Sequence, residues 1–157
     1  MSSSLGFDLA RFYTNKEEKR INFRKEWNIN DDEIAIGIIG RIVPIKDHAF
    51  FVNVIEKVLQ KTSQKIRVFI VGDGEDKSKV QELIYSKKMT YSENKERATF
   101  QFTSWIKDID HLNAGMDIIC LTSKNEGTPV SLIEAQASGK PIVSTNVGGI
   151  ENVIIPN

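Results

Sequence analysis

Short, nearly continuous apolar runs alternate along the chain with longer segments whose apolar residues recur at helical spacing. The run at residues 34–39 reads Ile-Ala-Ile-Gly-Ile-Ile, which is typical of a strand buried on both faces. Runs of the same kind predict four more strands, at residues 66–71, 98–102, 117–121 and 141–144. Helical patterns are predicted at residues 16–27, 46–61, 76–86, 108–114 and 129–138, with a partial helix near 150–154.

This alternation predicts an α/β fold, a Rossmann-like parallel sheet with right-handed crossovers and helices on both faces. A chain of 157 residues is long enough for one domain with its own core. We interpret residues 1–15 as a linker segment and residues 16–157 as that domain. Ligands of such folds bind at the carboxyl ends of the strands, so the loops after the first and fourth predicted strands should share one ligand-binding edge.

Two segments need a separate comment. The segment 16–27 has Ile21, Phe23 and Trp27 as its large apolar anchors, and its many charged residues are expected to face water. The polar stretch 87–97 is expected to form a surface loop.

The segment 126–139 contains the candidate site around which the chain is organised. Thr128 is expected to cap a helix, Pro129 to occupy its first position, and Gly139 to lie just past its end. The first turn carries no charged residue, so its amide groups and positive dipole end suit an anion.

Two carboxylates flank this helix start. Glu126 precedes the helix, and Glu134 shares one helix side with Val130, Ile133 and Ala137. A carboxylate on an apolar stripe costs free energy unless it is paired or hydrogen-bonded. Glu134 is therefore either a solvated residue at the edge of the stripe or a group that binds a ligand.

The loop after the first strand carries two cations, Arg41 and Lys46, behind Gly40. Either cation alone is typical of a solvated loop. A helix end contributes about 0.3–2 kcal/mol to anion binding, and each charge-assisted hydrogen bond about 1.5–3 kcal/mol. Binding at micromolar to millimolar strength needs about 4–8 kcal/mol, so a helix end facing both cations is sufficient for a diphosphate.

Composition narrows the classes of function. Lys and Arg total 21 and Asp and Glu total 21, so no nucleic-acid-binding field is expected. Cys120 is the single cysteine, which excludes an internal disulfide and suits a buried small hydrophobe in a reducing compartment. The apolar runs are too short to span a bilayer.

No cluster with metal-ligand spacing and no Ser-His-Asp or Cys-His arrangement is visible in the sequence. Asp108 and Asp110 resemble the paired-aspartate metal motif of some sugar transferases, but we interpret them as helix caps. His48 and His111 are interpreted as structural residues.

These motifs, taken in order, resemble one known family. They are Gly40-Arg41 with Lys46, Glu126-Gly127-Thr128-Pro129 with Glu134, the segment 139–145, and Gly148-Gly149-Ile150-Glu151. Together they resemble the C-terminal, donor-binding domain of retaining, GT-B-fold glycosyltransferases of the family-four, group-one kind. The segment 5–12 is similar to the part of that family that enters this domain from the interdomain linker.

The resemblance implies a site for a nucleotide-diphosphate sugar. By the family's pattern Arg41 and Lys46 hold the diphosphate leaving group and Glu126 meets hydroxyls of the transferred sugar, which makes these three the catalytic candidates. Glu134 is implied to bind the ribose, and residues near Trp105 to border the base through their backbone. The donor-binding residues implied in this way are Gly40, Trp105, Ile106, Lys107, Gly127, Thr128, Pro129, Val130 and Glu134.

The resemblance also implies a larger enzyme. No metal and no further cofactor is expected. An N-terminal domain that binds the acceptor, a sugar or a lipid-linked glycan, is implied but not visible here, so we expect an inactive fragment. Polysaccharide or glycolipid synthesis in the cytoplasm, at the inner face of a membrane, is the expected setting. The alternatives are a non-catalytic nucleotide- or anion-binding module and another GT-B enzyme, such as a sugar-nucleotide epimerase or a phosphorylase.

Overall fold

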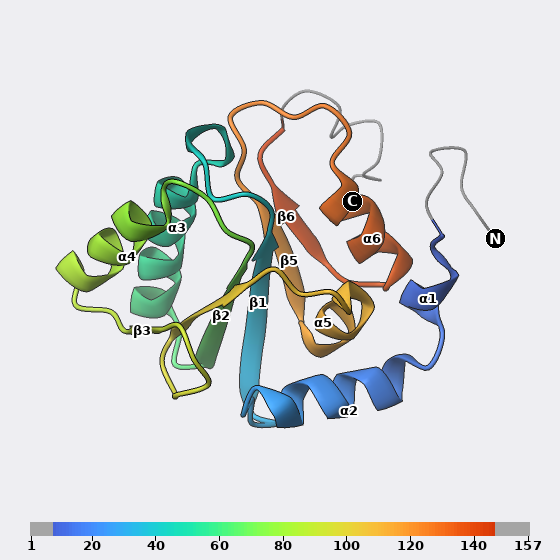
Figure 1. Cartoon of the computed structure of the whole chain (residues 1–157). Coiled ribbons are helices and arrows are strands. Elements are labelled where there is room, and N and C mark those ends of the chain that lie inside the picture. Colours follow the sequence, from blue (N-terminus) through green and yellow to red (C-terminus); the bar gives the residue numbers. More distant parts are fainter. Residues whose placement is uncertain (1–7, 147–157) are drawn as a thin grey trace.

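The computed structural model describes residues 8–146, which form a parallel sheet between two layers of helices (Figure 1). The six strands lie in the order β3-β4-β2-β1-β5-β6, and each neighbouring pair is parallel. The strands are β1 (Glu33–Ile39), β2 (Lys65–Val71), β3 (Tyr91–Ser92), β4 (Phe100–Ser104), β5 (Ile118–Leu121) and β6 (Ile142–Ser144). The predicted α/β, Rossmann-like architecture is confirmed.

The helices divide between the two faces of the sheet. They are α1 (Ala10–Tyr13), α2 (Lys16–Glu26), α3 (His48–Lys61), α4 (Lys77–Ser86), α5 (Ile109–Gly115) and α6 (Val130–Ala137), with a 3₁₀ turn η1 (Pro44–Lys46). Phe51 of α3 and Ile84 of α4 pack in one core with Ile38 of β1. On the opposite face, α2, α5 and α6 pack over a second core that includes Phe69 and Ile119 (Figure 1). Burial of β1 on both faces explains the unbroken apolar run at residues 34–39.

The structure differs from the sequence prediction at several boundaries. The stretch expected to be only a surface loop contributes the two-residue strand β3, in which Tyr91 pairs with Phe100. The predicted helix at 46–61 is divided by Asp47, whose φ of +52° separates η1 from α3. Strand β3 could not be predicted, because an edge strand of two residues has no run of apolar residues in the sequence. The expected helix near 150–154 and the glycine pair before it lie outside the described residues.

Helix α2 corrects the expectation that its charged residues face water. Arg24 is 6% exposed and donates to the carbonyls of Gly115, Asn30 and Glu33 at 3.0, 2.7 and 2.8 Å. Ile21, expected to be an anchor, is 57% exposed instead. A buried guanidinium is tolerated here because backbone acceptors from distant segments satisfy its donors.

Asp117, directly before β5, ties three elements together. Its carboxylate accepts hydrogen bonds from Arg20 at 2.8 Å, from Arg24 at 3.4 Å and from the Ala35 amide of β1 at 2.8 Å. Burial raises the pKa of Asp117, but the Ala35 amide and the guanidinium of Arg20 outweigh it, so the pKa lies below its ordinary value. Asp117 therefore fixes α2 and β5 against β1.

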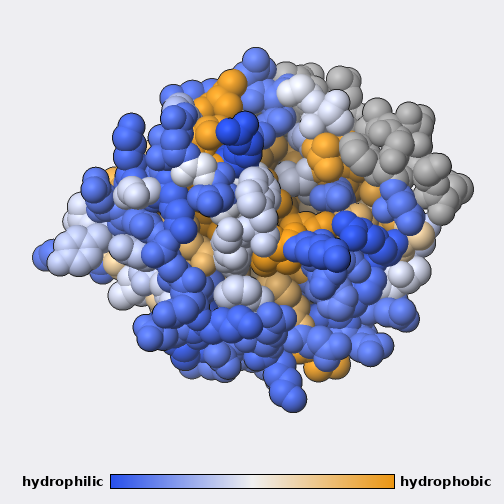
Figure 2. Space-filling view, in the orientation of Figure 1, coloured by the Kyte–Doolittle hydropathy of each residue, from blue (hydrophilic) through white to orange (hydrophobic). Residues whose placement is uncertain are grey.

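Figure 2 shows that the face viewed in Figure 1 is mainly hydrophilic, with small separate hydrophobic areas. Of the helices within residues 8–146, none has the length and apolar character needed to cross a membrane.

Asp117→Asn is expected to lower the free energy of unfolding at neutral pH by about 1.5–3 kcal/mol, because hydrogen bonds to a charged carboxylate are lost. A carboxyl group whose pKa is lower in the folded than in the unfolded state stabilises the fold at pH values above its unfolded-state pKa. This contribution disappears as the pH falls through the folded-state pKa. Urea denaturation from about pH 7 to about pH 2 should therefore show the difference between wild type and variant shrinking in acid. The exposed Asp31→Asn serves as control, and a difference that is the same at every pH contradicts the assignment.

Candidate functional site

A cleft of about 250 Å³ lies at the carboxyl edge of the sheet, where the end of β1, the loop after it and the start of α6 meet. Its lining residues are Ile39, Gly40, Lys46, Leu121, Glu126, Thr128, Pro129, Val130, Ser131 and Glu134. The expected meeting of the loops that follow residues 39 and 121 is confirmed, since both contribute to one cleft.

An ion pair joins the two loops across the cleft. Lys46 Nζ lies 2.9 Å from Glu126 Oε2, and both side chains are largely buried. The hydroxyl of Ser123 donates to the same oxygen at 2.7 Å. The carboxylate of Glu126 is thus held at one oxygen by two donors.

Residues directly after β5 also hold the backbone of the cation-bearing loop. Thr122 Oγ1 lies 3.1 and 3.2 Å from the carbonyl oxygens of Lys46 and Asp47, which share its single proton. The amide of Lys124 donates to the Ile45 carbonyl at 2.8 Å. The position of Lys46 is therefore set by the backbone as well as by its ammonium group. Sequence reasoning missed Thr122 and Ser123, although hydroxyl residues directly after a buried parallel strand lie where ligands bind.

Glu134 stands on α6 at the floor of the cleft and is half-buried. Burial raises its pKa, Arg11 opposes this shift, and nearby Asp110 adds to it, so the pKa lies above its ordinary value. In the described part of the chain, no hydrogen bond or ion pair joins the Glu134 carboxylate to another group. It is thus an acceptor whose capacity remains available to a ligand.

The start of α6 differs from the expected cap. Pro129 occupies the N-cap position and no side chain caps the helix, so Thr128 does not act as its cap. The Thr128 carbonyl instead accepts the Val130 amide at 2.9 Å, and the Pro129 carbonyl accepts the Leu132 amide at 3.0 Å. The first turn carries no acidic residue, which leaves its positive end suited to an anion.

The structure places the other candidates at varying distances from this cleft. Arg41 is exposed and is not among the residues that line it. Gly127 is exposed in the loop between Glu126 and Thr128. Trp105 is 57% exposed, and its ring lies 3.4 Å from the point where a side chain on Gly72 would begin. Trp105 is thereby placed at the ends of β2 and β4, on the same edge of the sheet.

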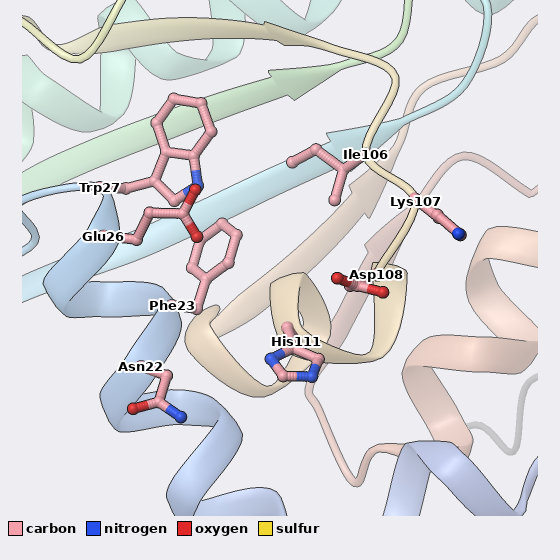
Figure 3. Close-up of a pocket in the computed structure, with 8 residues that line it drawn as sticks. All are labelled: Asn22, Phe23, Glu26, Trp27, Ile106, Lys107, Asp108 and His111. Carbon is pink, nitrogen blue, oxygen red and sulfur yellow. The ribbon is translucent and has the colours of Figure 1, made fainter.

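Ile106 and Lys107 line a different pocket of about 160 Å³ (Figure 3). Figure 3 shows Phe23 of α2 and Trp27, the residue after α2, facing Ile106 across it, with His111 of α5 on another side. The side chains of Ile106 and Lys107 are therefore not brought into the cleft that holds Lys46 and Glu126.

The paired aspartates do not act as two caps. Asp108 occupies the N-cap position of α5 without a side-chain cap bond. Asp110 is buried and forms an ion pair with Lys19 at 2.9 Å, which links α5 to α2. Among residues 8–146, no group of three His, Cys, Asp or Glu side chains could hold a metal ion.

Two buried residues have strongly shifted pKa values. Burial lowers the pKa of His48 to about 4, so its imidazole is neutral at neutral pH. Burial raises the pKa of the Cys120 thiol to about 12, and the expectation of a buried small hydrophobe is confirmed. The Cys120 thiol is therefore not ionised at neutral pH and is not a nucleophile in this state.

A parallel α/β sheet with an uncapped helix start and a cation loop at its carboxyl edge defines a class of proteins that bind anionic, nucleotide-like ligands. Residues 19–157 match the family of glycosyl transferases group 1, and the chain belongs to this family.

Known proteins similar to this chain agree with that family. The UDP-Gal:alpha-D-GlcNAc-diphosphoundecaprenol alpha-1,3-galactosyltransferase of Escherichia coli is 26% identical over 156 residues, 97% of this chain and 38% of that protein. The chain spans about a third of the length of the curated relatives it matches, 33% and 34% for two others.

Solved structures share the fold. HepE from Anabaena, in complex with UDP and glucose, has a TM-score of 0.79 at 20% identity, with 96% of this chain and 39% of that chain covered. The C-terminal domain of a glycosyl transferase group 1 family protein (LpcC) from Francisella tularensis has a TM-score of 0.73 at 21% identity, with 96% and 76% covered.

Thr122→Val should lower the free energy of unfolding by about 0.5–1.5 kcal/mol, because one hydroxyl that serves two carbonyls is removed. The amides of Lys46 and Asp47, which bond to Val43 and Pro44, should exchange with deuterium faster than in wild type. Thr103→Val is the matched control, since the Thr103 hydroxyl also donates to a carbonyl, but in an exposed hydrogen bond away from this loop. Equal exchange rates in Thr122→Val and wild type would show that this contact does not hold the loop.

Proposed function

We propose that the chain is the donor-binding domain of a glycosyltransferase that moves a sugar from a nucleotide-diphosphate sugar to an acceptor with retention of configuration. The observation that carries this proposal is the cleft in which Lys46 and Glu126 meet in front of an uncapped helix start. Membership of the family of glycosyl transferases group 1 supports the class of reaction.

The diphosphate binds between the start of α6 and the loop after β1. Lys46 and the amides of Gly127 and Thr128 contact it, and Arg41, next to the cleft-lining Gly40, closes over it from solvent. Departure of the diphosphate builds negative charge on its oxygens, and fixed cations and amides stabilise charge that develops there. No metal is needed for this step in our proposal.

The two glutamates bind hydroxyl groups at either side of the diphosphate. Glu126 accepts hydrogen bonds from the transferred sugar through its second carboxylate oxygen, since Oε2 already contacts Lys46 and Ser123. Glu134 accepts those of the ribose, for which its unused acceptor capacity and its place in the cleft are suited.

The base lies at the ends of β2 and β4. Trp105 is exposed at this edge, and the backbone of Ile106 and Lys107 continues from it. The side chains of the latter two residues face another pocket, which supports a contact through their backbone alone.

The whole protein carries the acceptor site on a further domain. A similar E. coli protein is named for a sugar linked to diphosphoundecaprenol, which supports a lipid-linked glycan as acceptor, in polysaccharide or glycolipid synthesis. The inner face of a membrane is the setting that we propose for it. We propose that the chain by itself binds donor without turning it over.

Calorimetric titration with UDP-, GDP- and ADP-sugars tests the proposal. At least one of these nucleotide sugars should bind to the wild-type chain. Lys46→Ala and Arg41→Ala should each lower the affinity for it about tenfold or more, as expected for loss of a charge-assisted hydrogen bond. Lys61→Ala, an exposed cation at the far end of α3, should bind like wild type. If no nucleotide sugar binds, or if Lys61→Ala weakens binding as much as Lys46→Ala, the proposed site is wrong.

Donor affinity should fall as pH is lowered towards the raised pKa of Glu134, because the ionised carboxylate accepts hydrogen bonds from hydroxyl groups more strongly than the protonated acid does. Glu134→Gln should weaken binding at neutral pH and remove much of this pH dependence. Burial disfavours the ionised form in the folded protein, so the same variant should raise the melting temperature of the ligand-free chain at neutral pH. If Glu134→Gln keeps the wild-type pH dependence of donor affinity, a group other than Glu134 is responsible for that dependence.

A further inference from the structure

Ser123 is a buried hydroxyl residue that contacts Glu126, and the proposed function assigns no role of its own to its side chain. It follows β5 directly and is 0% exposed. Its Oγ donates to Glu126 Oε2 at 2.7 Å, and its carbonyl accepts from Thr145 Oγ1 at 2.7 Å. A hydroxyl has one proton to donate, and here that proton goes to a carboxylate.

Lys46 contacts the same carboxylate oxygen, but in the proposed function its ammonium group also binds the diphosphate. It lies 2.9 Å from Glu126 Oε2 in the ligand-free cleft, while the proposed function assigns it to the diphosphate. A diphosphate carries more negative charge than one carboxylate, so a bound donor attracts the ammonium away from Glu126. Ser123 has no such alternative, since it is buried and its single donor faces Glu126.

The chain around Ser123 is itself fixed. The neighbouring Thr122 bonds to the loop that carries Lys46, and Thr145 bonds to the Ser123 carbonyl from beyond β6. The hydroxyl is thus a rigid donor, whereas Lys46 is a long, flexible one. Rigid support of a ligand-binding group is worth most when that group would otherwise turn on a loop.

We propose that Ser123 is a positioning residue for Glu126. It anchors Oε2 at the wall of the cleft when Lys46 turns to the diphosphate, so that the other carboxylate oxygen is presented to hydroxyls of the transferred sugar. The inference rests on the proposed function. A positioning role predicts that loss of the Ser123 hydroxyl lowers affinity for the sugar and leaves affinity for the nucleotide unchanged. A general stabilising role predicts no such difference.

The test compares affinity for a nucleoside diphosphate with affinity for the corresponding nucleotide sugar, by calorimetry on the whole chain. In wild type the sugar should add affinity. Ser123→Ala should reduce this added affinity about three- to tenfold, as expected for one hydrogen bond to a charged group, and leave nucleoside diphosphate binding within about twofold. In a Glu126→Gln background, Ser123→Ala should cause no further loss, because the hydroxyl acts through that carboxylate.

Ser138→Ala is the matched control: Ser138 is 2% exposed, and its hydroxyl has no hydrogen-bond partner among the described residues. It should leave both affinities unchanged. Equal weakening of nucleotide and nucleotide sugar by Ser123→Ala, or an additive loss in the double variant, would overturn the positioning role while leaving the proposed function in place. A wild-type chain that binds no nucleotide at all overturns both.

Discussion

The site depends on the hydrogen bonds by which the residues after β5 hold the loop after β1. That loop contains a proline and a residue at φ of +52°, so no ladder of sheet hydrogen bonds can place it. The hydroxyl of Thr122 and the amide of Lys124 bond to three consecutive carbonyls, at residues 45–47, instead. Because a cation that is already in place loses less freedom on binding, this arrangement stabilises a bound anion more than a free loop would.

In the ligand-free cleft the charges of Lys46 and Glu126 largely cancel. Lys46 is paired with Glu126, so in the proposed function an anion is attracted by the start of α6 and by an exchange of partners in that pair. Such an exchange costs less than exposing an unpaired buried charge, because each partner keeps at least one hydrogen bond. Glu134 is different: burial raises its pKa, Arg11 offsets this only in part, and none of the described residues hydrogen-bonds to its carboxylate. A carboxyl group with such a shifted pKa in a cleft is a candidate for ligand binding.

The parts of the structure that could be predicted are those with local signals. Strand β1 is buried on both faces, and the continuous apolar run at residues 34–39 indicates this directly. In β2 the apolar run is interrupted by Arg67, which is nevertheless buried. The burial of Arg24 could not be predicted, because its acceptors are carbonyls up to 91 residues away. Likewise the Lys46–Glu126 pair spans 80 residues, so the sequence indicated one shared edge but not which atoms meet. The Thr128 cap failed because Pro129 occupies that position.

Strand β5 connects the two ends of this arrangement. Before it, Asp117 bonds to α2 and to the Ala35 amide; after it, Thr122 and Ser123 bond to both sides of the cleft. Between them, β5 pairs with β1 in the register Ile36↔Ile118 to Ile38↔Cys120. A shift of one residue would move the loops by about 3.3 Å along the strand and break a 2.9 Å ion pair. Asp117, although far from the cleft, thus helps to set the register on which the meeting of Lys46 and Glu126 depends.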